Sequence, residues 1–286
     1  MTEAGPTVHR RLLGQALRGL RESAGLSQAS AAAQLGIQTS ALSKIENGKQ
    51  RVFPIQLPSY FRVYRCEDTP EAEQIRQLAS LAASGKRSNL LTLYSNVVQS
   101  QFAPYLAMEE LADKHDGYSW VVPGLLQTED YARALVKRSH QWRSPKKIKD
   151  FVDLRMARQK ILHRDNPPQI WTVLDEAALR RVVGRPHVMR KQLERLLEAS
   201  ESTPHLHIQV LPFNFGAHSG IDGPFQILYF PAGPPVVVVE SMTSALYLEE
   251  VSDVSRYETA INYLRTESLG ADASRQFIHN VLKELT

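Results

Sequence analysis

Glycine residues divide the first fifty residues into three short stretches of helical periodicity, and this spacing most constrains the fold. Leucine and alanine recur at steps of three and four within residues 12–24, which predicts an amphipathic helix. Gly25 ends this helix, and Ser27 is predicted to cap a second helix that ends before Gly36. A third helix is expected over residues 39–46. Three short helices with a glycine-containing turn between the second and the third are typical of a helix-turn-helix.

The charge of the chain is concentrated at its start. Residues 1–65 contain nine cations and three anions, a net charge of +6, whereas the whole chain carries only +4. A basic N-terminal region beside a nearly neutral remainder predicts a polyanionic partner, with nucleic acid first among the candidates. Charge alone is equally consistent with a chance excess of cations on a solvated surface.

The motif within residues 20–48 is long and rich in specific residues. It consists of Leu20-Arg21-Glu22, Gly25-Leu26-Ser27-Gln28, Leu35-Gly36-Ile37 and Ser43-Lys44-Ile45-Glu46-Asn47-Gly48. This pattern resembles the Xre family of phage-repressor-like DNA-binding domains. The resemblance implies an all-α head of about five helices, in which the third helix reads bases in the major groove.

The resemblance also implies roles for individual residues. Arg21 and Glu46 correspond to an internal ion pair between the first and third helices, which is structural rather than a DNA contact. Gln28 corresponds to a glutamine that bonds a phosphate and braces the recognition helix. The residues expected to contact DNA are Gln28, Gln38, Thr39, Ser40, Ser43, Lys44, Lys49 and Arg51.

Other interpretations of these positions stay open. Thr39 and Ser40 are also common at helix starts of any function, and Lys44 also suits a solvated surface. Serine and threonine both donate and accept hydrogen bonds, so they fit several base edges. The operator sequence therefore does not follow from these residues.

A polar stretch, Ser-Gly-Lys-Arg-Ser-Asn, separates two regions of different pattern. It predicts a DNA-binding domain over 1–84, a linker over 85–89 and a second domain over 90–286. Helical stretches alternate with strand-like runs in the second domain, and Pro-Ala-Gly-Pro-Pro joins two such runs as a hairpin. The predicted fold is an all-α head followed by a larger α+β domain with a mixed sheet.

The second domain also carries motifs that indicate a family. Val-Pro-Gly-Leu-Leu-Gln-Thr-Glu-Asp-Tyr-Ala-Arg spans 122–133, and Leu154-Arg155-x-Ala157-Arg158-Gln159 follows. These motifs resemble a C-terminal domain of unknown function that follows Xre heads in actinobacterial regulators. The resemblance implies that the partner is a small protein encoded by a neighbouring gene.

Motifs of catalytic and metal sites are missing from the sequence. There is no Gly-x-Ser-x-Gly elbow and no glycine-rich phosphate loop, so no enzyme activity and no cofactor are predicted. The single cysteine and the isolated pair His205 and His207 predict no metal site. Four aromatic residues suggest a ligand or partner pocket, although they are equally consistent with a core: Phe213, Phe215, Phe225 and Tyr247.

Together these observations predict a sequence-specific DNA-binding transcriptional regulator whose second domain binds a small protein or ligand that modulates DNA binding. We expect a homodimer on a palindromic operator, because one small head contacts only a half-site. The alternative is an antitoxin-like protein that binds a small neighbouring-gene partner and uses DNA binding for autoregulation. The first residues contain no apolar run, and no stretch is long enough to cross a membrane. The expected location is therefore the cytoplasm, in association with the nucleoid.

Overall fold

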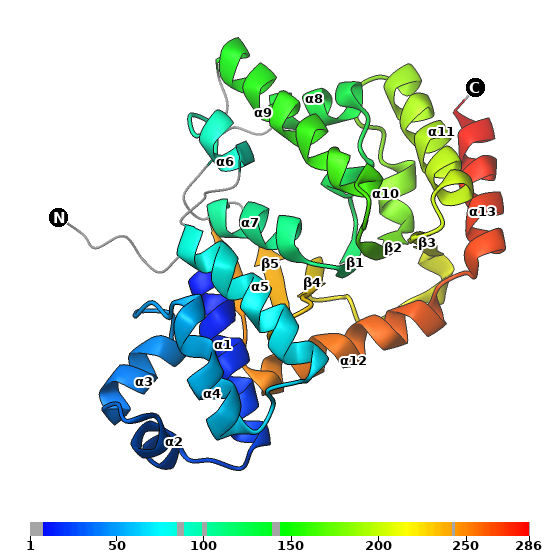
Figure 1. Ribbon diagram of the computed structural model, residues 1–286. Helices are drawn as coiled ribbons and strands as arrows, with labels where there is room; N and C mark the ends of the chain where they lie inside the picture. Colours follow the sequence, from blue (N-terminus) through cyan, green and yellow to red (C-terminus); the bar gives the residue numbers. More distant parts are fainter. Residues whose placement is uncertain (1–7, 85–88, 99–101, 139–143, 242–243, 286) are drawn as a thin grey trace. The chain divides into compact units, whose positions relative to one another are not determined.

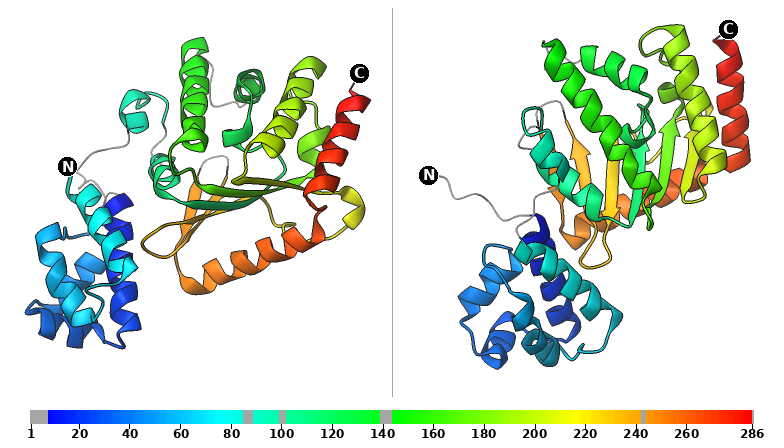
Figure 2. Two further views of the ribbon diagram at one scale, coloured as in Figure 1. Left: turned by 45° about the vertical axis from the view of Figure 1, so that its right-hand side comes forward. Right: turned by 45° about the horizontal axis from the view of Figure 1, so that its top comes forward.

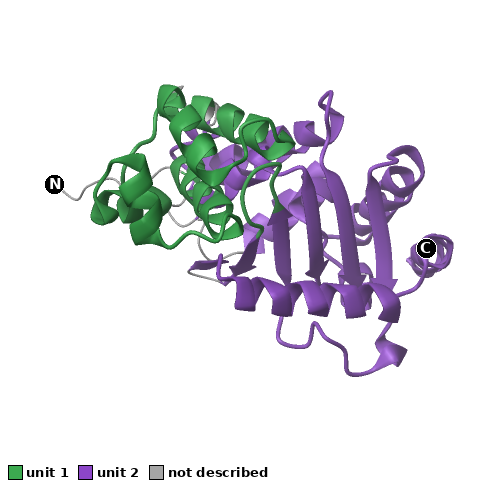
Figure 3. Ribbon diagram, turned by 60° about the horizontal axis from the view of Figure 1, so that its bottom comes forward, with its two compact units in different colours: residues 1–88, 229–235 green, residues 89–228, 236–286 purple. Residues whose placement is uncertain are grey.

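The computed structural model describes residues 8–84, 89–98, 102–138, 144–241 and 244–285. The chain divides into two compact units (Figure 3). Unit 1 contains residues 1–88 and 229–235, and unit 2 contains residues 89–228 and 236–286. Apart from Asn89, the linker predicted over 85–89 lies outside the described residues, so the domain boundaries stay predictions.

Unit 1 contains the predicted all-α head, which is confirmed (Figure 1). Its chain forms five α-helices and one short 3-10 helix within the described residues. In chain order these are α1 (Val8–Ser23), α2 (Gln28–Leu35), α3 (Thr39–Glu46), η1 (Pro54–Gln56), α4 (Leu57–Tyr64) and α5 (Pro70–Ser84). The helices α2 and α3 with their intervening turn form the helix-turn-helix.

Local residue chemistry sets the helix ends in the head. The Ser27 hydroxyl accepts a hydrogen bond from the Ser30 amide at 3.1 Å, which satisfies a free donor at the start of α2. Gly36 ends α2 with a φ of 69°, a left-handed conformation that favours glycine. Gly14 lets two backbones approach closely, because a Cβ there would lie 2.4 Å from the Ile45 carbonyl oxygen. This contact places α1 directly against the end of α3.

Unit 2 is built on a six-stranded sheet with the order β3-β2-β1-β4-β5-β6. The strands β1, β2 and β3 pair in parallel, whereas β4, β5 and β6 pair antiparallel, which confirms the predicted mixed sheet. Their bounds are β1 (Lys114–Ser119), β2 (Gln169–Asp175), β3 (Leu206–Leu211), β4 (Phe225–Tyr229), β5 (Val236–Glu240) and β6 (Ala245–Leu248).

Helices cover both faces of this sheet (Figure 2, left). The long helix α12 (Val251–Glu267) crosses one face of the sheet. Most of the other helices of unit 2 lie over the opposite face. The core on that opposite face joins apolar side chains of β3, α11 and α13, such as Val210, Leu193 and Ile278. The remaining helices are α6 (Asn89–Leu93), α7 (Ala103–Leu111), α8 (Glu129–Arg138), α9 (Pro145–Arg158), α10 (Glu176–Arg180), α11 (Pro186–Ser202) and α13 (Ala271–Glu284), with 3-10 turns η2 (Gly124–Leu126), η3 (Gln159–His163) and η4 (Phe213–Phe215).

Candidate nucleic-acid interface and a polar cavity

Helix α3 presents a polar surface at its first two turns. Thr39, Ser40 and Lys44 are exposed, Ser43 is half-buried, and the exposed Gln38 precedes the helix without capping it through its side chain. Within the described residues, the side chains of Thr39, Ser40 and Lys44 have no hydrogen bond or ion pair. This surface is therefore available for an external partner, as base reading requires.

A buried polar cluster fixes α3 against the two preceding helices. Arg21 of α1 donates from Nε to Glu46 Oε1 at 2.6 Å and from Nη2 to Oε2 at 3.1 Å. Gln28 of α2 donates from Nε2 to the same Oε2 at 2.9 Å. The hydrogen bonds that Arg21 donates to Glu46 raise the pKa of Arg21, so the guanidinium stays charged. One carboxylate thus ties α1 and α2 to the end of α3.

The remaining cations predicted to contact DNA follow α3. Lys49 and Arg51 are exposed in the loop that leads to η1. Gln28 is half-buried, and its amide nitrogen is engaged with Glu46 rather than with solvent. The structure therefore places Gln28 in the bracing role, and its role in phosphate binding stays a prediction.

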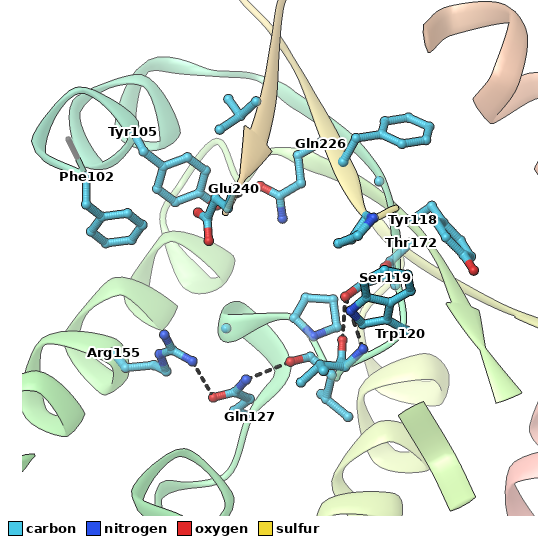
Figure 4. Close-up of a pocket in the computed structure, with 18 of the residues that line it drawn as sticks. Phe102, Tyr105, Tyr118, Ser119, Trp120, Gln127, Arg155, Thr172, Gln226 and Glu240 are labelled. Atoms are coloured by element: carbon cyan, nitrogen blue, oxygen red, sulfur yellow. Dashed lines mark hydrogen bonds between the residues drawn. The ribbon is translucent and has the colours of Figure 1, made fainter. Parts of the chain in front are cut away.

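Unit 2 contains a cavity of about 490 Å³ at the carboxyl end of β1, next to β4 (Figure 4). Its walls come from α7, β1, the turn after β1, α9 and the strands β4 and β5. Gly117 of β1 belongs to this wall, and a Cβ there would lie 3.2 Å from the Phe225 carbonyl oxygen. The aromatic residues in the wall are Phe102, Tyr105, Tyr118, Trp120 and Phe225.

One side of the cavity rests on a buried ion pair. Arg158 donates from Nε and Nη2 to the two carboxylate oxygens of Glu109, each at 2.7 Å. Burial disfavours both charges, but their mutual attraction outweighs it, so the pKa of Glu109 is lowered and that of Arg158 is raised. Tyr105 also donates to Glu109 at 2.7 Å. The charges and hydrogen-bonding groups of Arg158, Glu109 and Tyr105 are therefore already paired within the protein.

Arg155 lies in the same wall without a comparable partner. Its Nη1 donates to Gln127 Oε1 at 2.7 Å, and its Nε is buried with no hydrogen-bond partner. Burial, together with the charge of Arg158, lowers the pKa of Arg155 to about 10. The group is still a cation at neutral pH. It lies over the Phe151 ring, 5.0 Å from the ring centre, and has no ion pair among the described residues.

A carboxylate lines the opposite part of the cavity. Glu240 at the end of β5 is open to solvent, and Figure 4 shows its side chain across the empty space from Arg155. Partial desolvation by the surrounding protein raises the pKa of Glu240. The cavity therefore combines a cation, an anion and aromatic walls.

The structure does not bring together the four aromatic residues predicted to form a pocket. Phe213 and Phe215 are exposed in η4 after β3, at one edge of the sheet, whereas Tyr247 lies on β6, at the other edge. Of the four, only Phe225 lines the cavity described above.

Sequence reasoning did not identify Gln127, Arg155 or Glu240 as site residues. Gln127 and Arg155 lie in the two motifs that carried the resemblance of the second domain, so those motifs held the available signal.

Among the described residues, no cluster of histidine, cysteine or acidic side chains is arranged to hold a metal ion. None of the described helices combines the length and apolar character needed to span a bilayer.

Two known families match parts of the chain. A helix-turn-helix domain family matches residues 12–75. A domain of unknown function, DUF5753, matches residues 102–280, which is more than half of the 286 residues. No curated protein and no solved structure matches the chain significantly.

Proposed function

The chain belongs to the DUF5753 family, and from this premise we propose that it is a sequence-specific transcriptional regulator whose DUF5753 domain modulates DNA binding. Its helix-turn-helix domain indicates a DNA-binding regulator. The proposal assigns this head to the Xre family and the chain to the actinobacterial type. It also takes the chain to be a regulator rather than an enzyme.

One observation carries the proposal: α3 combines a rigid attachment with a free polar surface. The buried contacts of Glu46 hold the helix to α1 and α2, while Thr39, Ser40 and Lys44 stay exposed and unpaired. Hydrogen-bonding side chains read bases only when their helix is held in a defined orientation. The excess of cations in residues 1–65 supplies attraction to phosphate.

The proposal includes a dimer and a partner. A single helix-turn-helix head spans one half-site, so we infer a homodimer on a palindromic operator. A partner of the DUF5753 domain, either a small protein encoded by a neighbouring gene or a small molecule, alters DNA affinity. It does so by binding one of two arrangements of the dimer more tightly than the other.

The test is a comparison of two lysine variants of the full-length chain. Preferred duplexes are first selected from a random library with the wild-type protein, and binding is then titrated by fluorescence anisotropy. Lys44→Ala is expected to weaken binding by about 1–3 kcal/mol, as for loss of a base contact. Lys149→Ala is the matched control, because Lys149 is an exposed cation of α9 paired with Asp153 at 2.6 Å.

Two outcomes would contradict the proposal. The first is a random library from which no sequence is enriched. The second is an equal loss of affinity in both variants, which would remove α3 as the recognition helix. The affinity of the wild-type protein should also fall steeply with salt concentration, because cations released from DNA phosphates drive binding.

A further inference from the structure

We infer that the cavity in unit 2 binds a small amphoteric molecule with a planar apolar body. Its anionic group pairs with Arg155, and its hydrogen-bond donor, such as an ammonium group, faces Glu240. The aromatic side chains of the cavity wall contact the body of the molecule. The binding itself follows from the cavity alone, whereas any effect of this molecule on DNA affinity rests on the proposed function.

The hydrogen bonding of Arg155 differs from that of its neighbours. The guanidinium group of Arg164 donates from all three nitrogens, to the carbonyl oxygens of Asn166, Glu110 and Ala112 at 2.6, 2.8 and 3.1 Å. Arg158 donates from two nitrogens to one carboxylate. These are arginines with a structural role, and their donors are satisfied by the protein.

Arg155 has no anionic partner among the described residues. Its described hydrogen bond goes to the neutral amide of Gln127, and its buried Nε has no partner. The Arg155 side chain is half-buried, and a carboxylate or phosphate bound by its guanidinium group in a forked geometry would supply the missing counterion. Gln127 is itself fixed, because its Nε2 donates to the Val122 carbonyl oxygen at 2.6 Å. The guanidinium is therefore held in place for an external anion.

Near Glu240, the ligand should present a hydrogen-bond donor rather than a second anionic group. Among the described residues that line the cavity, Glu240 is the acidic one, and no ion pair within 4 Å is found for it. A ligand with only an anionic group would leave Glu240 repelling it across the cavity. A ligand that also carries an ammonium or hydroxyl group satisfies both ends.

The size and the position of the cavity fit a small molecule. A volume of about 490 Å³ lies within the range of roughly 300–1,000 Å³ that is common for ligand sites. The strand order also changes direction here, since β2 and β3 lie on one side of β1 and β4 lies on the other. In sheets with parallel strands, ligands bind beyond the carboxyl ends at such a change of direction.

Four indole compounds separate the contributions of the two charged groups. Tryptophan carries a carboxylate and an amine, indole-3-acetate only the carboxylate, tryptamine only the amine, and indole neither. Isothermal titration calorimetry of the full-length chain is expected to show the tightest binding for tryptophan and the weakest for indole. Arg155→Gln should weaken binding of tryptophan and indole-3-acetate by about 10- to 100-fold and leave tryptamine unchanged, because only the first two use the cation.

Further variants complete the test. Glu240→Gln should weaken binding of tryptophan and tryptamine and spare indole-3-acetate, whereas Lys149→Gln on the surface of α9 should change nothing. Arg155→Lys keeps the charge but loses the forked geometry, so it should give an intermediate loss and serves if Arg155→Gln does not fold. The inference is overturned if no probe binds saturably, or if the wild-type protein binds probes with and without a carboxylate equally.

The same probes distinguish this inference from the proposed function. If tryptophan binds through Arg155 but leaves operator affinity unchanged, the site stands and its coupling to DNA is refuted. If selected duplexes bind normally while all four indoles fail, the regulator stands and the ligand site is refuted.

Discussion

The substitution Glu46→Ala tests whether one buried carboxylate holds α3 in place. It removes two hydrogen bonds from Arg21, at 2.6 and 3.1 Å, and one from Gln28, at 2.9 Å. It also leaves the Arg21 side chain, which is only 8% exposed, without its main counterion. Losing one partner of a buried pair costs about 3–5 kcal/mol. Arg21 keeps its hydrogen bond to the Leu26 carbonyl oxygen, so we expect about 3 kcal/mol.

Hydrogen–deuterium exchange of the full-length chain measures this loss in the head alone. A decrease of about 3 kcal/mol in opening free energy accelerates exchange in α1, α2 and α3 by about 100-fold or more. All three tryptophans follow residue 88 in the sequence, at positions 120, 142 and 171, so their fluorescence reports on the second unit and should not change. Arg18→Ala is the control. It breaks an exposed pair with Glu22, 51% exposed on each side, and should cost about 0–1 kcal/mol.

The reasoning is refuted if Glu46→Ala accelerates exchange no more than Arg18→Ala does. A double variant, Arg21→Met with Glu46→Leu, separates the ion pair from the packing. It leaves no buried charge behind, so it should recover most of the stability lost in Glu46→Ala. Because α3 stays packed in this variant, its DNA affinity should exceed that of Glu46→Ala.

Two further predictions concern the buried polar groups of unit 2. Burial lowers the pKa of His115 to about 4, so between pH 6.5 and 4 the unfolded chain takes up a proton that the folded chain does not. Stability therefore falls as the pH falls through this window, by about 3 kcal/mol in total, and His115→Gln should remove this part of the pH dependence of urea unfolding. Arg158→Met leaves the buried Glu109 carboxylate without its counterion and with only the hydrogen bond from Tyr105, so it should destabilise unit 2 by about 3–5 kcal/mol. Lys149→Met should change nothing. Tryptophan fluorescence in urea measures both variants, and a loss below about 1 kcal/mol in Arg158→Met would contradict the role of the pair.

The head was predictable because its helix boundaries depend on local chemistry. Ser27 caps α2, and Gly36 ends it in a left-handed conformation, as the residue types alone indicate. The contact between Arg21 and Glu46 has a different origin, since these residues lie 25 positions apart. Only the resemblance to a family suggested it, because helix periodicity gives no information about which distant helices meet.

The strand β1 shows where sequence reasoning failed in unit 2. Its residues, Lys-His-Asp-Gly-Tyr-Ser, lack the apolar alternation that predicts a strand, and no strand was expected there. Asp116 is nevertheless 1% exposed, because Lys114 and Arg265 neutralise it. Arg265 belongs to α12, so the group that makes this polar strand tolerable in the core lies far along the chain.

The same long-range dependence explains why the predicted aromatic pocket and the observed cavity differ. Phe213, Phe215 and Phe225 lie close in sequence, but the chain passes from β3 at one edge of the sheet to β4 beyond β1 between them. That crossing separates neighbours in sequence and brings the turn after β1 beside the start of β4. Of the polar residues that break the expected pattern, Ser119 of β1 and Arg155 of the later motif line the cavity, whereas Lys114, His115 and Asp116 do not. Departures from local consistency are concentrated where a protein gives up stability for binding, so polar residues such as Ser119 and Arg155 carried a signal for the site that the search for aromatic residues did not use.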